Sequence, residues 1–268
     1  MPLHHADALA VLPTVGDNSH DLVICDPPYN VGMAYEGSCN DSLPPREYRA
    51  WCAGWFHHCF RIAAKFFIIF PGLKHLADWN HYLPSGQGSW FKPGNPSGGG
   101  AFRYCESEPW LLWTKGGAWC SYSDTITAPL PSHGQRDTGG HPCPKPPKLY
   151  AELLRRFKPT SVLDPFMGSG TMGVECAKLS IPFTGIELSQ VYFATASARI
   201  AAALGESPHQ WTGQLAIDAA IAANSPSPPS APSLDCDTAP AGRLFDPGKR
   251  LVSRRTDGRK RGRRRTER

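Results

Sequence analysis

Short, dense apolar runs and longer helical stripes alternate along this chain, a pattern that is typical of a sheet covered by helices. Residues 22–25 and 65–70 are runs rich in branched and aromatic side chains, and each stops at a proline, which predicts two buried strands. Between them, the prolines at 44 and 45 predict the start of a helix. Its apolar side is expected in the core, and it carries Tyr48, Trp51, Trp55 and Phe56.

The second half of the chain repeats this alternation. Strands are predicted at 160–163 and 183–187, with a helix between them at 171–178. One helix before this group and one after it each have an apolar face, formed by Leu149, Leu153, Leu154 and Phe157 in the first and by Tyr192, Ala196, Ile200 and Leu204 in the second. A further helical rhythm runs over residues 4–12. Strands that alternate with helices in this way predict an α/β domain.

The periodicity weakens between residues 73 and 140, where Gly, Pro and Trp become frequent. The glycine-containing stretches 85–94 and 98–100 are expected not to pack as regular elements, whereas residues 108–115 predict a strand.

The segment Asp26-Pro27-Pro28-Tyr29 follows the first predicted strand, and open α/β sheets bind ligands at the carboxyl ends of their strands. The two prolines fix the turn and remove two N–H donors, so a carboxylate, carbonyls and an aromatic ring are left to face a ligand. This set suits a planar aromatic substrate that carries an amino group. Asp26 and the carbonyl after Pro27 would accept its two hydrogens, and Tyr29 would stack on its face.

The tetrapeptide resembles the DPPY motif of amino-group DNA methyltransferases, and three later stretches resemble other motifs of that family. Residues 161–171 look like its FxGxG methyl-donor loop, residues 141–146 like its HPxxKP segment, and residues 183–187 like the strand that ends in a ribose-binding acid. The donor loop follows the DPPY segment by about 135 residues, and this order resembles the β-class of N6-adenine and N4-cytosine methyltransferases. The resemblance implies an α/β, Rossmann-like methyltransferase fold that uses S-adenosyl-L-methionine, with a mostly parallel, doubly wound sheet and a circularly permuted motif order.

The resemblance also implies roles for individual residues. The catalytic ones would be Asp26, Pro27, Pro28 and Tyr29, and the donor-binding ones Asp7, His141, Lys145, Asp164, Pro165, Phe166, Gly168, Ser169, Gly170, Thr171 and Glu187. The glycines at 168 and 170 would let the backbone approach the donor closely, and Glu187 lies 23 residues after Asp164, near the spacing expected of a ribose-binding acid. Asp7 has an alternative role as a surface residue at the start of a helix.

Two functions of other classes remain open. Residues 168–173 also satisfy G-x-G-x-x-G after a strand, which is the signature of an NAD(P)-binding oxidoreductase. That alternative leaves the DPPY segment unexplained, and the chain after residue 168 is short for a full dinucleotide-binding domain. A nucleic-acid-binding protein of the same fold without activity is the other alternative. Within the methyltransferases, the aspartate at position 26 resembles the adenine-N6 enzymes more than the cytosine-N4 ones, which often carry serine there.

The net charge of +5 is unevenly distributed. Residues 243–268 hold 12 Lys and Arg against three acids, so this segment carries +9 and the rest of the chain −4. Together with the Pro- and Ser-rich stretch before it, residues 223–268 predict a disordered linker and basic tail, after a catalytic domain at 1–222. Residues 73–140 would form an inserted target-recognition region. Basic residues there that could contact phosphates are Lys92, Arg103, Lys115 and Arg136.

The partner implied is double-stranded DNA, with a cognate restriction endonuclease as a candidate second partner and the oligomeric state, monomer or homodimer, left open. Nine cysteines without a Cys-x-x-Cys pair and without a preceding signal peptide indicate reduced thiols in a prokaryotic or phage-encoded cytoplasmic protein. No metal is expected, because the one Cys/His cluster, at residues 52–59, matches no zinc spacing. No apolar run approaches the length of a membrane span.

Overall fold

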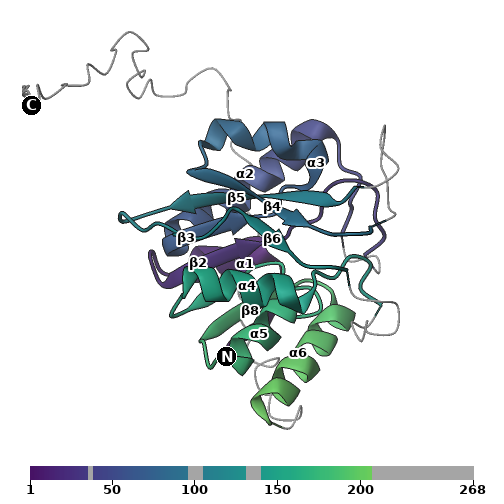
Figure 1. The fold of residues 1–268 in the computed structure, drawn as a ribbon. Helices are drawn as coiled ribbons and strands as arrows, with labels where there is room; N and C mark the ends of the chain where they lie inside the picture. The colour runs from purple at the N-terminus through teal and green to yellow at the C-terminus, as the bar shows by residue number, and fades with distance from the viewer. Residues whose placement is uncertain (36–38, 96–104, 131–139, 207–268) are drawn as a thin grey trace, which may run out of the picture. The chain divides into compact units, whose positions relative to one another are not determined.

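A computed structural model describes residues 1–35, 39–95, 105–130 and 140–206. These residues form an eight-stranded sheet with helices on both faces (Figure 1). The strand order is β1-β8-β7-β2-β3-β5-β4-β6. None of the described helices is long and apolar enough to cross a membrane.

Five neighbouring strands are parallel and form the half of the sheet that positions the site. They are β1 (Leu3–His5), β8 (Phe183–Glu187), β7 (Val162–Asp164), β2 (His20–Cys25) and β3 (Ala63–Ile69). Strand β7, from the second half of the chain, pairs with β2, from the first half. The donor-loop strand and the DPPY strand are therefore adjacent, and the expected doubly wound, permuted arrangement is confirmed.

The other half of the sheet comes from the region of weak periodicity. Strand β5 (Ser107–Thr114) is antiparallel to both β3 and β4 (Gly86–Phe91), and β6 (Thr125–Thr127) pairs in parallel with β4. The strand predicted at 108–115 is confirmed. The expectation that residues 85–94 form no regular element is wrong, because β4 lies within them.

The glycine that suggested an irregular segment has a packing role in β4. A Cβ atom on Gly88 would lie 2.0 Å from the ring of Trp110 on β5, so only glycine fits beside this indole. Trp90, two residues later, is 2% exposed, and its indole N–H donates to the carbonyl of Ala128. A strand that looks glycine-rich and irregular in sequence is thus held by two buried tryptophans.

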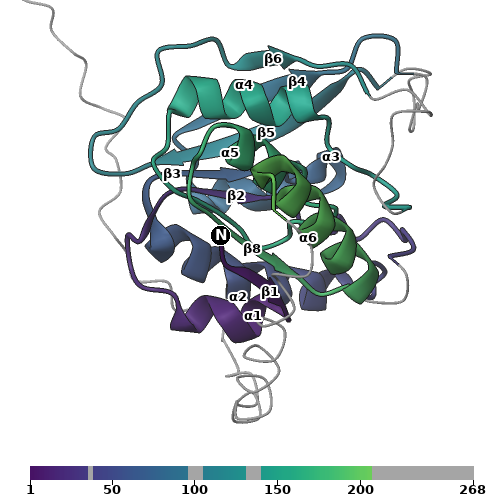
Figure 2. The same ribbon diagram turned by 90° about the horizontal axis from the view of Figure 1, so that it is seen from below.

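The helices divide between the two faces of the sheet (Figures 1 and 2). The first face is covered by α1 (Ala8–Val11), α2 (Pro45–Ile62) and the short helices η1 (Leu12–Thr14), α3 (Gly72–His75) and η2 (Leu76–Tyr82). The second is covered by α4 (Pro147–Phe157), α5 (Thr171–Lys178) and α6 (Gln190–Leu204), with α5 and α6 side by side in Figure 2.

Each face has its own apolar core, because successive side chains of a strand point to opposite faces. In β2, Leu22 and Ile24 pack with α4 and α5, while Val23 and Cys25 pack with α2. This explains why the run reads as continuously hydrophobic: both faces of the strand are buried.

The amino terminus departs from the prediction of one helix over residues 4–12. Leu3–His5 is instead the edge strand β1, and α1 begins only at Ala8. The carboxylate of Asp7 accepts the backbone N–H of Leu9 and so caps α1. A three-residue strand that pairs on one side only carries too little periodicity to be recognised from sequence.

Only part of the predicted domain division lies within the described residues. The described portions of residues 73–140 supply β4, β5 and β6 to the common sheet. The boundary at 222 and the basic tail lie outside the described residues, as do Arg103 and Arg136.

Candidate active site

A cavity of about 230 Å³ opens at the carboxyl ends of the parallel strands. The DPPY segment after β2, the glycine loop after β7, the end of β8 and the link after β1 all reach it. Eleven of the predicted site residues line it: Asp7, Asp26, Pro28, His141, Lys145, Pro165, Phe166, Gly168, Ser169, Thr171 and Glu187. The topology therefore brings both predicted halves of the site to one cavity.

The glycine loop after β7 is shaped by two glycines with positive φ. Gly168 has φ +51°, and a Cβ atom there would lie 2.8 Å from Nε2 of His141. Gly170 has φ +77° at the start of α5, and its Cβ atom would lie 2.7 Å from that of Ala196. The absence of a side chain at Gly168 therefore leaves room for His141 in the cavity wall. Gly170 instead allows α5 to pack against α6, and it is not among the described lining residues.

Asp164 also supports the loop from behind. It is 3% exposed, and its carboxylate accepts the backbone N–H of Phe166. Burial raises the pKa of Asp164 to about 8. Asp164 is not among the described residues that line the cavity, so its expected contact with the donor stays a prediction.

Glu187 faces the cavity with both carboxylate oxygens fixed. Oε2 accepts the N–H of Gly168 at 2.9 Å, and Oε1 accepts the N–H of Ser189 at 2.7 Å. Burial raises the pKa of Glu187, and the backbone donors oppose that rise. Each oxygen keeps a second lone pair, so the carboxylate can still accept hydrogen bonds from ligand hydroxyls.

His141 offers a polar atom that has no partner within the described chain. Its Nδ1 is buried and makes no hydrogen bond there, and its ring lies 4.7 Å from that of Tyr192. Burial, assisted by the charge of Lys145, lowers the pKa of His141 to about 4, so the ring is neutral near pH 7. With Glu187 and Asp7 on the same wall, these acceptors fit a ligand that carries hydroxyls and a positive charge, as S-adenosyl-L-methionine does.

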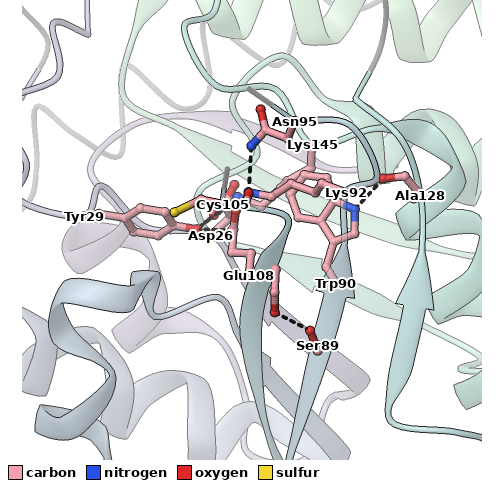
Figure 3. Close-up of polar contacts among 11 residues, drawn as sticks. Asp26, Tyr29, Ser89, Trp90, Lys92, Asn95, Cys105, Glu108, Ala128 and Lys145 are labelled. Carbon is pink, nitrogen blue, oxygen red and sulfur yellow. Dashed lines mark hydrogen bonds and ion pairs between the residues drawn. The ribbon is translucent and has the colours of Figure 1, made fainter. Parts of the chain in front are cut away.

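Asp26 lies in a compact polar cluster rather than alone at the end of β2 (Figure 3). Nζ of Lys145 donates to Oδ1 of Asp26 at 2.6 Å and lies 3.1 Å from Oε1 of Glu108 on β5. The hydroxyl of Tyr29 lies 2.6 Å from Asp26 Oδ1 and 2.9 Å from Glu108 Oε1. We call these four residues the Asp26 cluster. One ammonium and one hydroxyl thus bridge two carboxylates.

The charges in the Asp26 cluster change one another's protonation. Burial raises the pKa of Asp26, and the nearby Glu108 adds to this, while Lys145 and Tyr29 oppose it. Burial would also raise the pKa of Glu108, but Lys145 and Lys92 outweigh it and the net shift is downward. Burial would lower the pKa of Lys145, but the two carboxylates outweigh it and the net shift is upward, so Lys145 stays charged.

Two expectations for this cluster stay predictions. Lys145 lines the cavity and its ammonium is bonded to Asp26, so any contact with the donor would be made from within the Asp26 cluster. Tyr29 is not among the described lining residues, and its ring packs over Gly72. Stacking of Tyr29 on a substrate therefore requires its side chain to turn, and it stays a prediction.

The two prolines lie differently. Pro28 lines the cavity, and its carbonyl accepts the hydroxyl of Tyr48 at 2.9 Å. Pro27 is buried and is not among the described lining residues, so the use of its carbonyl by a substrate amine stays a prediction.

Sequence reasoning missed Asp41, which organises the loop after the DPPY segment. Its carboxylate accepts the backbone N–H groups of Asn30, Val31 and Met33, at 2.6, 3.1 and 2.8 Å. The side chain of Asn30 also exchanges two hydrogen bonds with the backbone of Leu43. These bonds fix the base of the loop to Asp41 and to Leu43. The preference of Asp for backbone N–H groups in tight loops was the available signal.

Aromatic residues assigned to the core also form cavity walls. Trp51 is only partly buried and lines the cavity beside Phe166, with ring centroids 5.7 Å apart. Tyr192 lines it from α6, and Tyr35, a residue the sequence did not single out, lies edge-on to His141. A helical apolar stripe predicts burial, and it cannot distinguish burial in a core from burial beside a ligand.

Two predicted phosphate-contacting lysines have other partners. Lys92 Nζ pairs with Oε2 of Glu108 at 3.1 Å, and its side chain is 12% exposed. Lys115 Nζ donates to Asn18 and to the carbonyls of Phe60 and Ala63, at the edge of the sheet opposite the cavity. A phosphate would have to compete with these bonds for either lysine, and phosphate contact stays a prediction for both.

Metal ligation has no support in the described ranges, where no group of three or more His, Cys, Asp and Glu residues could hold an ion. The cysteines at 52 and 59 are buried in α2 and pack in the core.

Comparisons with known proteins agree with this architecture. Residues 102–198 match the N6/N4 methyltransferase family, described as DNA methylase. The type II methyltransferase M.HpaI of Haemophilus parainfluenzae is 27% identical over 228 residues, which cover 73% of this chain and 72% of that protein.

Solved structures share the fold. The M1.HpyAVI–SAM complex has a TM-score of 0.57 at 23% identity and covers 74% of this chain and 98% of that one. The cytosine-N4-specific PvuII DNA methyltransferase has a TM-score of 0.60 at 16% identity, covering 81% and 91%. The chain is therefore similar to N6/N4 DNA methyltransferases over residues 102–198 and to type II methyltransferases over most of its length, and its fold is that of S-adenosyl-L-methionine-dependent methyltransferases.

Proposed function

We propose that this protein is a site-specific DNA methyltransferase that transfers the methyl group of S-adenosyl-L-methionine to the exocyclic N6 of adenine in duplex DNA. The observation that carries the proposal is the position of Asp26, whose carboxylate reaches the same cavity as the glycine loop and Glu187. An aspartate there can accept a hydrogen bond from an amino group, and the resemblance to adenine enzymes noted at this position favours adenine over cytosine.

A base inside a duplex cannot reach this cavity, so we infer that the target nucleotide is flipped out of the helix. Asp26 and the carbonyl of Pro27 would then accept the two hydrogens of the amine and orient its nitrogen toward the donor. The walls around Trp51 and Phe166 provide apolar surface that excludes water.

On the donor side, Glu187 would bind ribose hydroxyls, and Asp7 and His141 would contact other polar groups of the donor. Gly168 and Ser169 would form the floor beneath it. S-adenosyl-L-methionine supplies a methyl group already activated by the sulfonium, so direct transfer needs no covalent enzyme intermediate. The protein's contribution is to bind, to orient and to hold the amine's hydrogens.

The match of residues 102–198 to the DNA methylase family favours donor binding by residues 168–173 over the dinucleotide-binding alternative. Cytosine N4 remains the second candidate, because a cytosine-N4-specific enzyme shares this fold with a TM-score of 0.60. The type II relatives make a cognate restriction endonuclease a reasonable partner to propose, and a monomer or homodimer is compatible with the described cavity, which this chain forms by itself.

The experiment that tests the function uses radiolabelled S-adenosyl-L-methionine and unmethylated genomic DNA, followed by digestion and chromatography of the nucleosides. We expect label in N6-methyladenine. Label in N4-methylcytosine would move the assignment to cytosine, and no label in either base, with donor binding intact, would refute the proposed acceptor.

The role of Asp26 is tested by Asp26→Ala. We expect methyl transfer to be lost while donor binding, measured by calorimetry, is largely retained, because the donor contacts lie on the other wall. A matched control is Asp17→Ala, which removes a carboxylate whose side chain is 69% exposed and paired with Arg61. Asp26→Ala with most of the wild-type rate would show that the carboxylate is not needed.

A further inference from the structure

The mechanism above uses Asp26 but leaves Glu108 without a role. Glu108 comes from β5, in the part of the chain expected to recognise the target, yet its carboxylate lies in the Asp26 cluster (Figure 3). Its Oε1 shares both the ammonium of Lys145 and the hydroxyl of Tyr29 with Asp26. Its other oxygen pairs with Lys92. The chain of charges therefore runs Asp26, Lys145, Glu108, Lys92.

All four charged side chains are largely withdrawn from water. Their exposed fractions are 17% for Asp26, 5% for Lys145, 14% for Glu108 and 12% for Lys92. Buried charges persist only when they are paired, and here two negative and two positive groups alternate. Such an arrangement requires four suitable residues from four segments of the chain, which would not be needed if Asp26 alone were sufficient.

Aromatic rings restrict Lys145 further. Its Nζ lies 5.2 Å from the ring centre of Tyr29, 5.1 Å from that of Phe70 and 5.8 Å from that of Trp90. These rings favour a cation and replace water around it. Lys145 therefore cannot follow a change in the charge of Asp26 by turning to solvent, and a second carboxylate must stay beside it.

Methyl transfer makes such a change in charge. The N–CH3 bond forms as the S–CH3 bond breaks with its electron pair returning to sulfur, and the amine must then release one proton. Asp26 is the base that touches the amine, so taking the proton makes its carboxyl neutral. Lys145 would then be a buried cation without its nearest counter-ion, were Glu108 absent.

We propose that Glu108 is a positioning residue that holds Lys145 through the reaction and thereby allows Asp26 to accept the proton from the target amine. Glu108 does this in two ways. It keeps a counter-charge next to Lys145 when Asp26 is protonated, and its negative charge near Asp26 makes that carboxylate a better proton acceptor. The proton leaves afterwards to water in the cavity. This inference rests on the proposed role of Asp26, and it holds for adenine or cytosine as the acceptor.

Other ionisable groups near Asp26 do not replace Glu108. Apart from Lys145, these groups are neutral near pH 7, so none of them can serve as a counter-ion to the Lys145 ammonium. They are, besides Lys145, the thiols of Cys25 and Cys143, the hydroxyls of Tyr29, Tyr35 and Tyr150, and the carboxyl of Asp164. Burial raises the pKa of each of these thiols, hydroxyls and the carboxyl, so they stay protonated near pH 7.

The test is the pH dependence of single-turnover methyl transfer with saturating donor and DNA. Glu108→Gln removes a negative charge beside Asp26 while keeping the side-chain shape, so the acid limb of the profile should move to lower pH, by about half a unit or more, and the plateau rate should fall. Lys92→Met removes the cation beyond Glu108, so the acid limb should move to higher pH. The double variant Glu108→Gln/Lys92→Met removes one charge of each sign, so its acid limb should move less than that of either single variant.

Glu106→Gln is the matched control. Glu106 lies two residues away and accepts the backbone N–H of Gly94, outside the Asp26 cluster. Its profile should equal that of the wild type. Donor affinity and thermal unfolding of every variant separate loss of folding from loss of the proton-accepting role.

An acid limb that stays in place in both Glu108→Gln and Lys92→Met, with donor binding intact, would overturn the proposal and leave Glu108 a structural residue. A profile without an acid limb in the wild type and in Lys92→Met would overturn it as well. The proposed function fails differently: the wild type would then label neither base, or Asp26→Ala would keep its rate.

Discussion

Gly168 is the position where a single added carbon should be most informative about donor binding. The substitution Gly168→Ala places a Cβ atom 2.8 Å from Nε2 and 3.2 Å from Cδ2 of His141. Optimal separations between such atoms are about 3.5–4.0 Å, so the imidazole must move by several tenths of an ångström or more. Because His141 lines the cavity, the movement is expected to disturb the volume that the donor occupies.

Two effects contribute to the cost, and the chain offers a control for one of them. An alanine with φ +51° carries backbone strain of about 1–2 kcal/mol. Gly117→Ala carries the same kind of strain at φ +76°, but a Cβ atom there meets nothing within 4 Å. Both variants should lose the stability that this strain costs, and Gly168→Ala should lose more because its Cβ atom meets His141. Only Gly168→Ala should lose donor affinity, by about tenfold or more, which is about 1.4 kcal/mol.

Isothermal calorimetry with S-adenosyl-L-methionine measures this difference, and urea unfolding measures the shared strain. Adding His141→Ala removes the ring that the new carbon meets. In that background, Gly168→Ala should cost much less affinity than in the wild type, which is a coupling between two touching residues. Equal donor affinity in Gly168→Ala and Gly117→Ala would refute the assignment of the glycine loop to the donor.

Three other predictions follow from contacts in the structure. Asp41→Asn should lower the free energy of unfolding by about 2 kcal/mol in urea titrations and slow methyl transfer, since an amide cannot accept all three N–H groups of the loop. Asp164 has a folded-state pKa of about 8, above its unfolded value of 3.8, so its contribution to stability is fully present below about pH 4 and lost as pH rises through 8. Asp164→Asn should therefore unfold with a smaller difference between pH 6 and pH 9 than the wild type. Lys115→Met should lower thermal stability and leave DNA affinity and its salt dependence unchanged, because the lysine bonds the edge opposite the cavity.

The parts of this protein that could be predicted from sequence are those specified by local chemistry. Strand β2 and helix α5 were predicted because a buried strand ending in prolines and a glycine loop opening a helix each contain their own signal. Asp26 and Glu187 were placed correctly at the cavity for the same reason, since each follows directly from the end of a parallel strand.

The features that sequence did not reveal depend on partners far along the chain. Whether Lys92 meets a phosphate or a carboxylate is decided by Glu108, 16 residues away on another strand. Gly88 suggests an irregular loop until Trp110 is placed across from it. The charge of Lys92 and the small size of Gly88 each allow several environments. Which environment forms is decided by the strands that pair beside them.

The cluster around Asp26 shows why these two kinds of information must be combined to understand the reaction. The DPPY segment contains the carboxylate, but the proton affinity of Asp26 depends on Lys145, 119 residues later, and on Glu108 on an antiparallel strand. The two motifs are far apart along the chain, and they lie close together because β7 and β2 are neighbours, so the proposed donor and target sites share the ends of those strands. The side of the sheet beyond β3 also contributes, since β5 supplies the second carboxylate. A region that sequence marks as target recognition is thereby also part of the environment in which the amine loses its proton.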